Sequence, residues 1–179
     1  MGLFLNVGIV KNCDNKKAEN YLKEWADTND TDIIPKECKV EMQNEDVLIE
    51  LNEYGADGEE FFKYVSEKNN DAAMYLYIYD GDFWGYFLYD KGKEIDIFNP
   101  IPDYFEENIE DVEKYAGNAE IIAKYFNANK DEIKKFLVIW PEDEDEYEED
   151  CDDEEAKYYF DEWGLVDFMK SLGYEYHEE

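Results

Sequence analysis

The sequence contains no arginine, so all 17 of its basic residues are lysine. Arginine carries the planar fork that binds phosphates and carboxylates through two parallel hydrogen bonds, and the chain lacks it. The 49 acidic residues outnumber the lysines and leave a formal net charge of -32. Such a field repels a phosphate backbone and an anionic membrane surface. The composition therefore argues against nucleic-acid and membrane partners and favours a basic protein or cations.

Histidine is almost absent, since His177 is the only one and lies near the C-terminal end. A Ser–His or Cys–His nucleophile pair would have to use this residue. The sequence also has no HExxH, GxxxxGK[ST], GxGxxG or CxxC motif. These absences argue against histidine-ligated metal sites, nucleophilic hydrolases, nucleoside triphosphatases and dinucleotide-dependent oxidoreductases. We expect a protein that is not an enzyme and holds no cofactor.

The chain has only three cysteines, Cys13, Cys38 and Cys151, and they are widely spaced. An odd number without metal-ligand spacing indicates neither a disulfide framework nor a zinc site. Long hydrophobic runs are also absent. The apolar start lacks the basic region and cleavage pattern of a signal peptide, and no run reaches membrane-spanning length. We therefore expect a cytoplasmic protein with reduced thiols.

Apolar residues are nevertheless plentiful, at 44% hydrophobic and 17% aromatic in 179 residues. This content suffices for a packed core and argues against a disordered chain. The length fits a single domain over residues 1–179. Within it we expect a sheet-containing core at residues 1–100 and a mostly helical part at residues 101–179, which includes an acidic loop at residues 141–155.

Hydrophobic spacing predicts an α+β fold. The first six expected elements have the order of a ferredoxin-like βαββαβ unit, and a further β-hairpin extends its antiparallel sheet. Short helices are expected around residues 121–126, 132–137 and 165–172, with residues 138–140 as a helix end or a small strand. The expected elements of the core are a strand at 3–10, a helix at 15–27, strands at 38–42 and 47–51, a helix at 57–68, and strands at 73–79, 83–89 and 94–98.

The two faces of the predicted sheet need separate cover. In a ferredoxin-like unit both helices lie on one face. On one register the other face carries Tyr75, Tyr77 and Tyr79, while Met74 and its alternating neighbours point to the helices. We expect the C-terminal helices to cover the tyrosine face or to leave it open as a binding surface.

The turn at Asp80, Gly81 and Asp82 offers one candidate site. Paired carboxylates near aromatic rings, here Trp84 and Tyr86, are typical of enzymes that cleave glycosides. Asp-Gly is also a common hairpin turn, and aspartate is abundant in this chain. The sequence favours the turn, and the alternative function is a carboxylate-dependent enzyme that acts on carbohydrate through Asp80 and Asp82.

A second candidate lies in the acidic run, which we define as residues 142–155. It lacks the glycine that a calcium loop needs at its sixth position, so it is not an EF-hand, although weak divalent cation binding stays open. Such a run is commonly a solvated loop that only adds charge. Here tyrosine and tryptophan lie among the acids, and both are enriched at binding hot spots. The predicted partner-binding residues are Asp143, Asp145, Tyr147, Glu148, Asp152, Tyr158, Tyr159 and Trp163.

Several segments resemble a family of small acidic bacterial proteins without assigned activity. They are MGLFLNV, LYIYDGDFWGYFLYDKGKEID, FNPIPDYF, GNAEIIAKYF and DFMKSLGYEY. Some members of this family are similar to immunity proteins, which neutralise toxins. The segments are packing and turn motifs, so they assign no functional residue. The leading hypothesis is a non-enzymatic acidic binding protein, an immunity-type inhibitor of a basic protein such as a toxin nuclease, whose carboxylates stand in for substrate phosphates.

Overall fold

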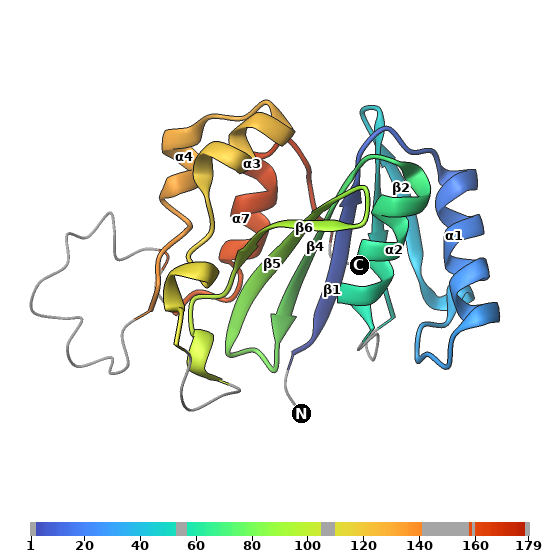
Figure 1. Ribbon diagram of the computed structural model, residues 1–179, viewed down its shortest axis with the longest axis horizontal. Coiled ribbons are helices and arrows are strands. Elements are labelled where there is room, and N and C mark those ends of the chain that lie inside the picture. Colours follow the sequence, from blue (N-terminus) through green and yellow to red (C-terminus); the bar gives the residue numbers. More distant parts are fainter. Residues whose placement is uncertain (1–2, 53–56, 105–109, 141–157, 159, 178–179) are drawn as a thin grey trace, which may run out of the picture. The chain divides into compact units, whose positions relative to one another are not determined.

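The computed structural model of the chain describes residues 3–52, 57–104, 110–140, 158 and 160–177. Within these residues it contains one six-stranded antiparallel sheet and five α-helices (Figure 1). This architecture confirms the predicted α+β class.

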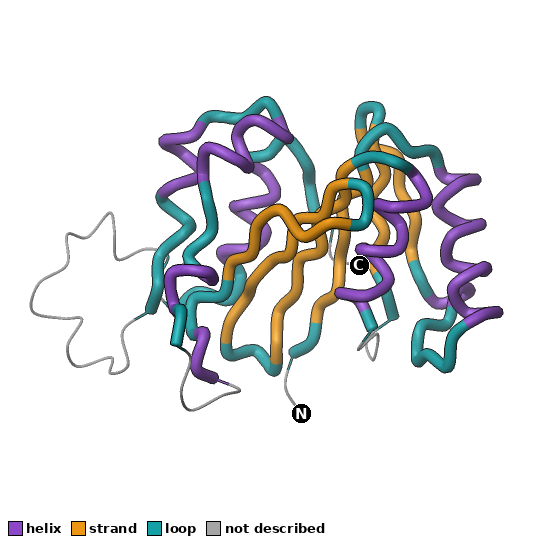
Figure 2. The backbone as a smooth tube through the Cα atoms, viewed as in Figure 1, coloured by secondary structure: helices purple, strands orange, loops and turns teal. Residues whose placement is uncertain are grey.

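Helices and strands lie close to the positions expected from hydrophobic spacing, and Figure 2 shows how they alternate with loops along the backbone. The strands are β1 (Leu5–Val10), β2 (Lys39–Gln43), β3 (Asp46–Glu50), β4 (Ala72–Tyr79), β5 (Phe83–Asp90) and β6 (Lys93–Phe98). The α-helices are α1 (Asn15–Thr28), α2 (Gly58–Asn69), α3 (Ala119–Phe126), α4 (Lys130–Lys134) and α7 (Gly164–Ser171). Short 3-10 helices occur at η1 (Pro35–Glu37), η2 (Pro102–Tyr104) and η3 (Val112–Tyr115).

The strands are arranged in the order β2-β3-β1-β4-β5-β6. β1 lies in the interior and pairs antiparallel with both β3 and β4, so that Gly8 is opposite Ile49 on one side and Tyr75 on the other. β2 and β3 form a hairpin that places β2 at one end of the sheet.

The chain forms two compact units. Unit 1 consists of Met1–Asp80 and Tyr86–Asp96, and unit 2 of Gly81–Gly85 and Ile97–Glu179. The second unit therefore includes the start of β5 as well as the chain from Ile97 onward. That both units belong to a single domain stays a prediction.

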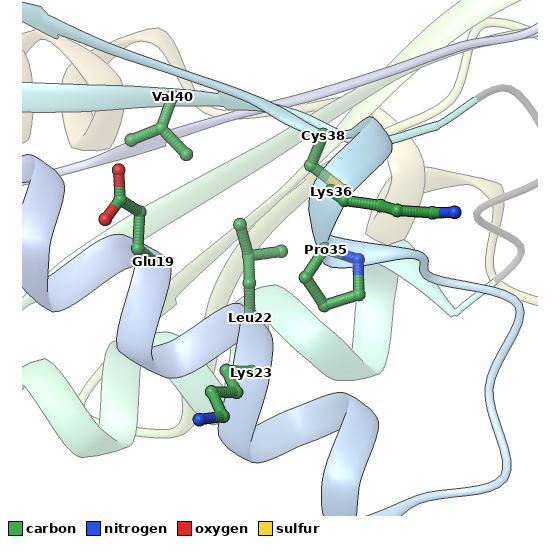
Figure 3. A pocket seen from close by; sticks show the side chains of 7 residues that line it. All are labelled: Glu19, Leu22, Lys23, Pro35, Lys36, Cys38 and Val40. Carbon is green, nitrogen blue, oxygen red and sulfur yellow. The ribbon is translucent and has the colours of Figure 1, made fainter.

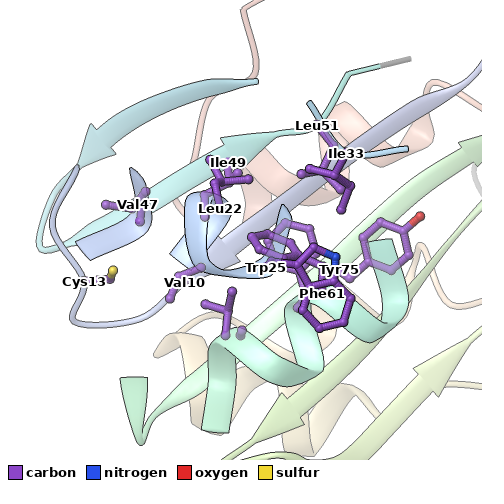
Figure 4. Packing of buried hydrophobic residues seen from close by; sticks show 14 of the residues in the cluster. Val10, Cys13, Leu22, Trp25, Ile33, Val47, Ile49, Leu51, Phe61 and Tyr75 are labelled. Atoms are coloured by element: carbon purple, nitrogen blue, oxygen red, sulfur yellow. The ribbon is translucent and has the colours of Figure 1, made fainter. Parts of the chain in front are cut away.

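In unit 1, two amphipathic helices cover one face of the sheet. α1 begins after Asp14, whose carboxylate accepts a hydrogen bond from the backbone N–H of Lys17 at 2.9 Å and so caps the helix. The Trp25 ring of α1 lies 5.9 Å from the ring of Phe61 and 5.2 Å from that of Tyr64, both on α2. Figure 4 shows the resulting core, which includes Val10, Leu22, Ile33, Val47, Ile49, Leu51 and Tyr75.

The tyrosine face of β4 is the face that α1 and α2 cover. Tyr75 stacks on Phe62 of α2 with ring centroids 5.5 Å apart, and its hydroxyl donates to Asn6 Oδ1 at 2.6 Å. Tyr77 is partly buried against the same core. The register that placed these tyrosines on the second face is therefore wrong. The row of rings fits here because Gly8 has no side chain, and a Cβ at this position would lie 2.0 Å from Phe62 Cε1.

β2 also differs from expectation. Apolar residues alternate with charged ones along this strand, which is typical of one buried face, but Val40 is only partly buried and Met42 is 40% exposed. The cause is its place at the end of the sheet, where only one neighbouring strand covers it. β3, one position further in, buries both faces, with Val47 at 0% and Leu48 at 5% exposure.

Unit 2 is built from short helices and aromatic contacts. Trp84 packs on Phe98 and on Phe168 of α7, with ring centroids 5.0 and 5.1 Å apart. Asn129 caps α4 by accepting a hydrogen bond from the backbone N–H of Asp131 at 2.9 Å. α4 ends at Lys134, and residues 138–140 form neither a helix end nor a strand.

Candidate functional site

Most of the predicted partner-binding residues lie outside the described residues. These are Asp143, Asp145, Tyr147, Glu148, Asp152 and Tyr159, and the predicted weak cation binding by the acidic run lies there too. Tyr158 and Trp163 lie within the described residues, but only Trp163 lines the hollow that forms the candidate site.

Tyr158 is partly buried, and its ring centroid lies 4.4 Å from that of Phe136. Phe136 in turn packs edge-on against Phe168 of α7 at 5.7 Å. One face of Tyr158 therefore contributes to the packing of unit 2, and its partial exposure leaves the remainder of the side chain at the surface.

Trp163 stands at the start of α7. Its backbone N–H donates to Asp161 Oδ1 at 3.1 Å, and α7 begins at the next residue, Gly164. Gly164 is buried so closely that a Cβ there would lie 3.2 Å from Trp84 Nε1. The backbone beneath Trp163 is thus held in place, while its side chain is only partly buried.

Trp163 lines a hollow of about 340 Å³. Its lining combines two carboxylates, two aromatic rings and one aliphatic side chain, namely Asp161, Trp163, Val166, Asp167 and Tyr176. Ring faces and carboxylates both attract a desolvated cation. The hollow therefore suits the ammonium of a lysine or the guanidinium of an arginine, with the alkyl stem of that residue against Val166.

Of these lining residues, sequence reasoning identified Trp163 alone. Val166 and Asp167 follow it at positions i+3 and i+4, which lie on the same side of a helix. That spacing was a usable signal once α7 was predicted. Tyr176 comes from beyond the end of α7, where Gly173 adopts φ +92° and turns the chain, and no local pattern indicates its return to the hollow.

The alternative site has the geometry of a turn. Asp80 and Gly81 adopt positive φ angles of 52° and 75°, and the Asp82 carboxylate accepts a hydrogen bond from the Tyr104 hydroxyl at 2.6 Å. The nearby rings are buried, Trp84 at 1% exposure and Tyr86 at 0%. Because the faces of these rings are used in packing, they offer no surface on which a sugar could stack.

Among the described residues, no three histidine, cysteine, aspartate or glutamate side chains converge to hold a metal ion. In the same part of the chain, no helix combines the length and apolarity needed to cross a membrane. A scan against protein-family models, a search of curated proteins and a search of solved structures each find no match to the chain.

Proposed function

We propose that this chain is a non-enzymatic acidic binding protein that holds a basic protein at the hollow around Trp163. The observation that carries the proposal is a partly buried Trp163 in one hollow with Asp161 and Asp167. Tryptophan is among the residues that contribute most to binding when they line a desolvated pocket.

Charge supplies the second support. A net charge of -32 attracts a basic partner over distances beyond contact and raises its association rate. Long-range attraction alone does not select one basic protein over another. A hollow that accepts one lysine or arginine side chain adds this selection, because only a partner that presents such a side chain in the right place can use it.

The partner class we propose is a basic toxin such as a nuclease, which the chain inhibits as an immunity protein does. The resemblance to immunity-like acidic proteins supports this class, as does the ability of carboxylates to stand in for phosphates at a basic active site. Inhibition then takes place in the cytoplasm. The acidic run adds attraction for the partner and binds divalent cations weakly.

We also propose that β1, α1, β2, β3, α2 and β4 form a ferredoxin-like unit to which β5 and β6 are added. The order β2-β3-β1-β4 and the antiparallel pairing of β1 with β3 and β4 support it. The placement of α1 and α2 on the same face of these strands is a further support.

Affinity purification with the full chain tests the binding function. The tagged protein is incubated with lysate from its own cells at low and high salt, and retained proteins are identified by mass spectrometry. We expect a basic protein at low salt that is partly released at high salt. If no basic protein is retained at either salt concentration, the proposed function is wrong.

The hollow is then tested by variants of the same chain. Trp163→Ala should weaken the complex by about 2 kcal/mol or more, as is typical of a hot-spot residue. Asp167→Asn and Glu113→Gln each remove one negative charge, but only Asp167 lines the hollow. We expect a clear loss for Asp167→Asn and a small one for Glu113→Gln. Equal losses in these two variants would show that charge alone binds the partner and that the hollow is not the site.

A further inference from the structure

The outer edge of β2 presents backbone hydrogen-bonding groups. In an antiparallel sheet, successive residues of a strand bond to the neighbours on opposite sides. The Leu51 N–H donates to the Asn6 carbonyl at 2.8 Å, so the backbone groups of Leu51 face β1. Leu48 comes three residues earlier, an odd number, so its backbone groups face the opposite side and bond toward β2. Leu48 is opposite Glu41. The backbone groups of Glu41 therefore face β3, and those of its two chain neighbours face away from the sheet.

These two neighbours are Val40 and Met42, and their side chains extend an apolar strip along the edge. Met42 is 40% exposed, and Val40 and Cys38 are partly buried. This strip borders the face on which α1 lies, because Val40 and Met42 are opposite Ile49 and Val47 of the core. An edge strand with an apolar strip is a site where a further strand can pair.

A hollow of about 400 Å³ lies beside the same edge, between α1, η1 and β2. In Figure 3, Leu22 of α1 points toward β2 and Val40 points back toward α1. Its lining combines four uncharged side chains with three charged ones, and the Glu19 carboxylate also points toward Val40 (Figure 3). The lining residues are Glu19, Leu22, Lys23, Pro35, Lys36, Cys38 and Val40.

We propose that the β2 edge is a second interaction surface, which takes up an extended segment of a partner protein as an added strand. The segment pairs with the backbone of Val40 and Met42 and places an apolar side chain in the hollow beside Val40. This is recognition by strand addition, in which main-chain hydrogen bonds supply affinity and side-chain pockets supply specificity. The surface belongs to unit 1, and the inference does not depend on the hollow at Trp163.

Charge selects the occupant. A second copy of this chain would bring its own net charge of -32 to the edge, and the two copies would repel each other. A basic segment is attracted instead. On the face of β2 opposite to the apolar strip, Lys39 is paired with Glu50 at 3.6 Å and Glu41 is exposed. A lysine or arginine placed across from Glu41 therefore gains a cross-strand pair. The occupant we assign is an extended segment in which apolar and basic residues alternate.

The probe for this surface is a synthetic peptide of alternating valine and lysine, with a peptide of the same composition in shuffled order as its control. Amide hydrogen exchange of the full chain is measured by NMR with each peptide. The alternating peptide should slow exchange at Val40 and Met42 by about tenfold or more, since both amides gain a strand hydrogen bond. The Glu41 amide, which already faces β3, should change little. Unchanged exchange at Val40 and Met42 under saturating peptide, or equal slowing by the shuffled peptide, overturns the proposal.

Variants of the edge complete the test. Val40→Pro removes an outward N–H without breaking a bond to β3, and should weaken binding of the alternating peptide about tenfold. Val40→Ile keeps the N–H donor and an apolar side chain beside the hollow, and should bind nearly as the wild type does. If Val40→Pro fails to fold, Glu41→Lys replaces it, because it reverses the charge that faces the peptide and leaves the backbone intact. If the edge variant binds the alternating peptide as strongly as the wild type does, the proposal is wrong. It is also wrong if, without peptide, protection of the Val40 and Met42 amides grows with protein concentration, because a second copy of the chain is then the occupant.

Discussion

Units 1 and 2 are stabilised in different ways. Unit 1 contains the longer helices, with 14 residues in α1 and 12 in α2, and these pack on strands of defined register. Unit 2 contains α3, α4 and α7, with 8, 5 and 8 residues. Helices shorter than about 12 residues are marginal in water without tertiary packing. Unit 2 therefore depends on helix caps and aromatic contacts, whereas unit 1 depends on its sheet and a continuous core.

This difference bears on function. The hollow around Trp163 is positioned by a short helix whose buried residues include Leu165, Phe168 and Met169. The β2 edge is positioned by hydrogen bonds along a strand. A binding site on unit 2 can therefore be lost through the loss of a few contacts, while the β2 edge is preserved as long as the sheet is intact.

The largest effects should come from removing one buried ring in each unit. Phe62→Ala in unit 1 and Phe168→Ala in unit 2 each remove a side chain with 0% exposure, and each should lower the free energy of unfolding by about 3–5 kcal/mol. Urea denaturation measures the loss. Amide exchange should increase mainly in β1 and β4 for the first variant and in α7 for the second. If exchange increases equally throughout the chain in both variants, the two units do not differ in the way described.

Two glycine substitutions should have intermediate effects for opposite reasons. Gly8→Ala forces a Cβ against Phe62 and should cost about 1–3 kcal/mol by overpacking. A second substitution, Phe62→Leu, should make Gly8→Ala less costly.

Gly173→Ala meets no atom within 4 Å, but its φ of +92° strains any Cβ. It should cost about 1–2 kcal/mol. Thermal unfolding of the single and double variants distinguishes overpacking at Gly8 from backbone strain at Gly173. If Phe62→Leu leaves the cost of Gly8→Ala unchanged, overpacking against Phe62 is not its cause.

Smaller effects should follow from removing helix caps. Asn118 accepts hydrogen bonds from Glu120 and Ile121 N–H, and Asn129 accepts from Asp131 N–H. Replacing either asparagine by alanine should cost about 1 kcal/mol. The matched control is Asp, which keeps the acceptor and should cost little. Amide exchange should become faster within the helix whose cap was removed. An equal increase in unit 1 would show that the cap does not act on its own helix alone.

The last effect concerns pH and unit 1, and it appears only at alkaline pH. Burial, with the nearby Asp14 charge, raises the pKa of Cys13 from 9.0 to about 11. Because the pKa of Cys13 is higher in the folded state than in the unfolded state, the neutral thiol contributes fully to the free energy of unfolding below pH 9.0. This contribution is lost as pH rises toward 11. Cys13→Ala should therefore lose less stability than the wild type over this range. Urea unfolding at several alkaline pH values measures the difference, and parallel curves for the two proteins would contradict it.

The sequence predicted most elements of the fold because apolar spacing differs clearly between helices and strands. It did not predict which face of β4 lies against α1 and α2. The tyrosines alternate with Met74, Leu76 and Ile78, which are also buried, so both faces of the strand are apolar. When both faces are buried, alternation no longer distinguishes inside from outside.

The candidate site was predicted in part. Trp163 stood out because a tryptophan follows a very acidic stretch. Val166 and Asp167 lie one helical turn away from it, whereas Tyr176 reaches the hollow only through the turn at Gly173. Side chains brought together by a turn after a helix have no spacing signal in the sequence, and only the structure reveals them. The β2 edge was missed for a similar reason, because the position of a strand in the sheet is not local information.

The distribution of tryptophans has a practical consequence for spectroscopy. Trp25 is 8% exposed in unit 1, beside Tyr64, whereas Trp84, Trp140 and Trp163 belong to unit 2. Fluorescence emission from Trp25 can thus be separated from the emission of unit 2 by replacing tryptophan with phenylalanine in one unit at a time. A denaturant titration of the two resulting proteins reports each unit through its own chromophore, and quenching of Trp163 by a bound partner can be followed without a label.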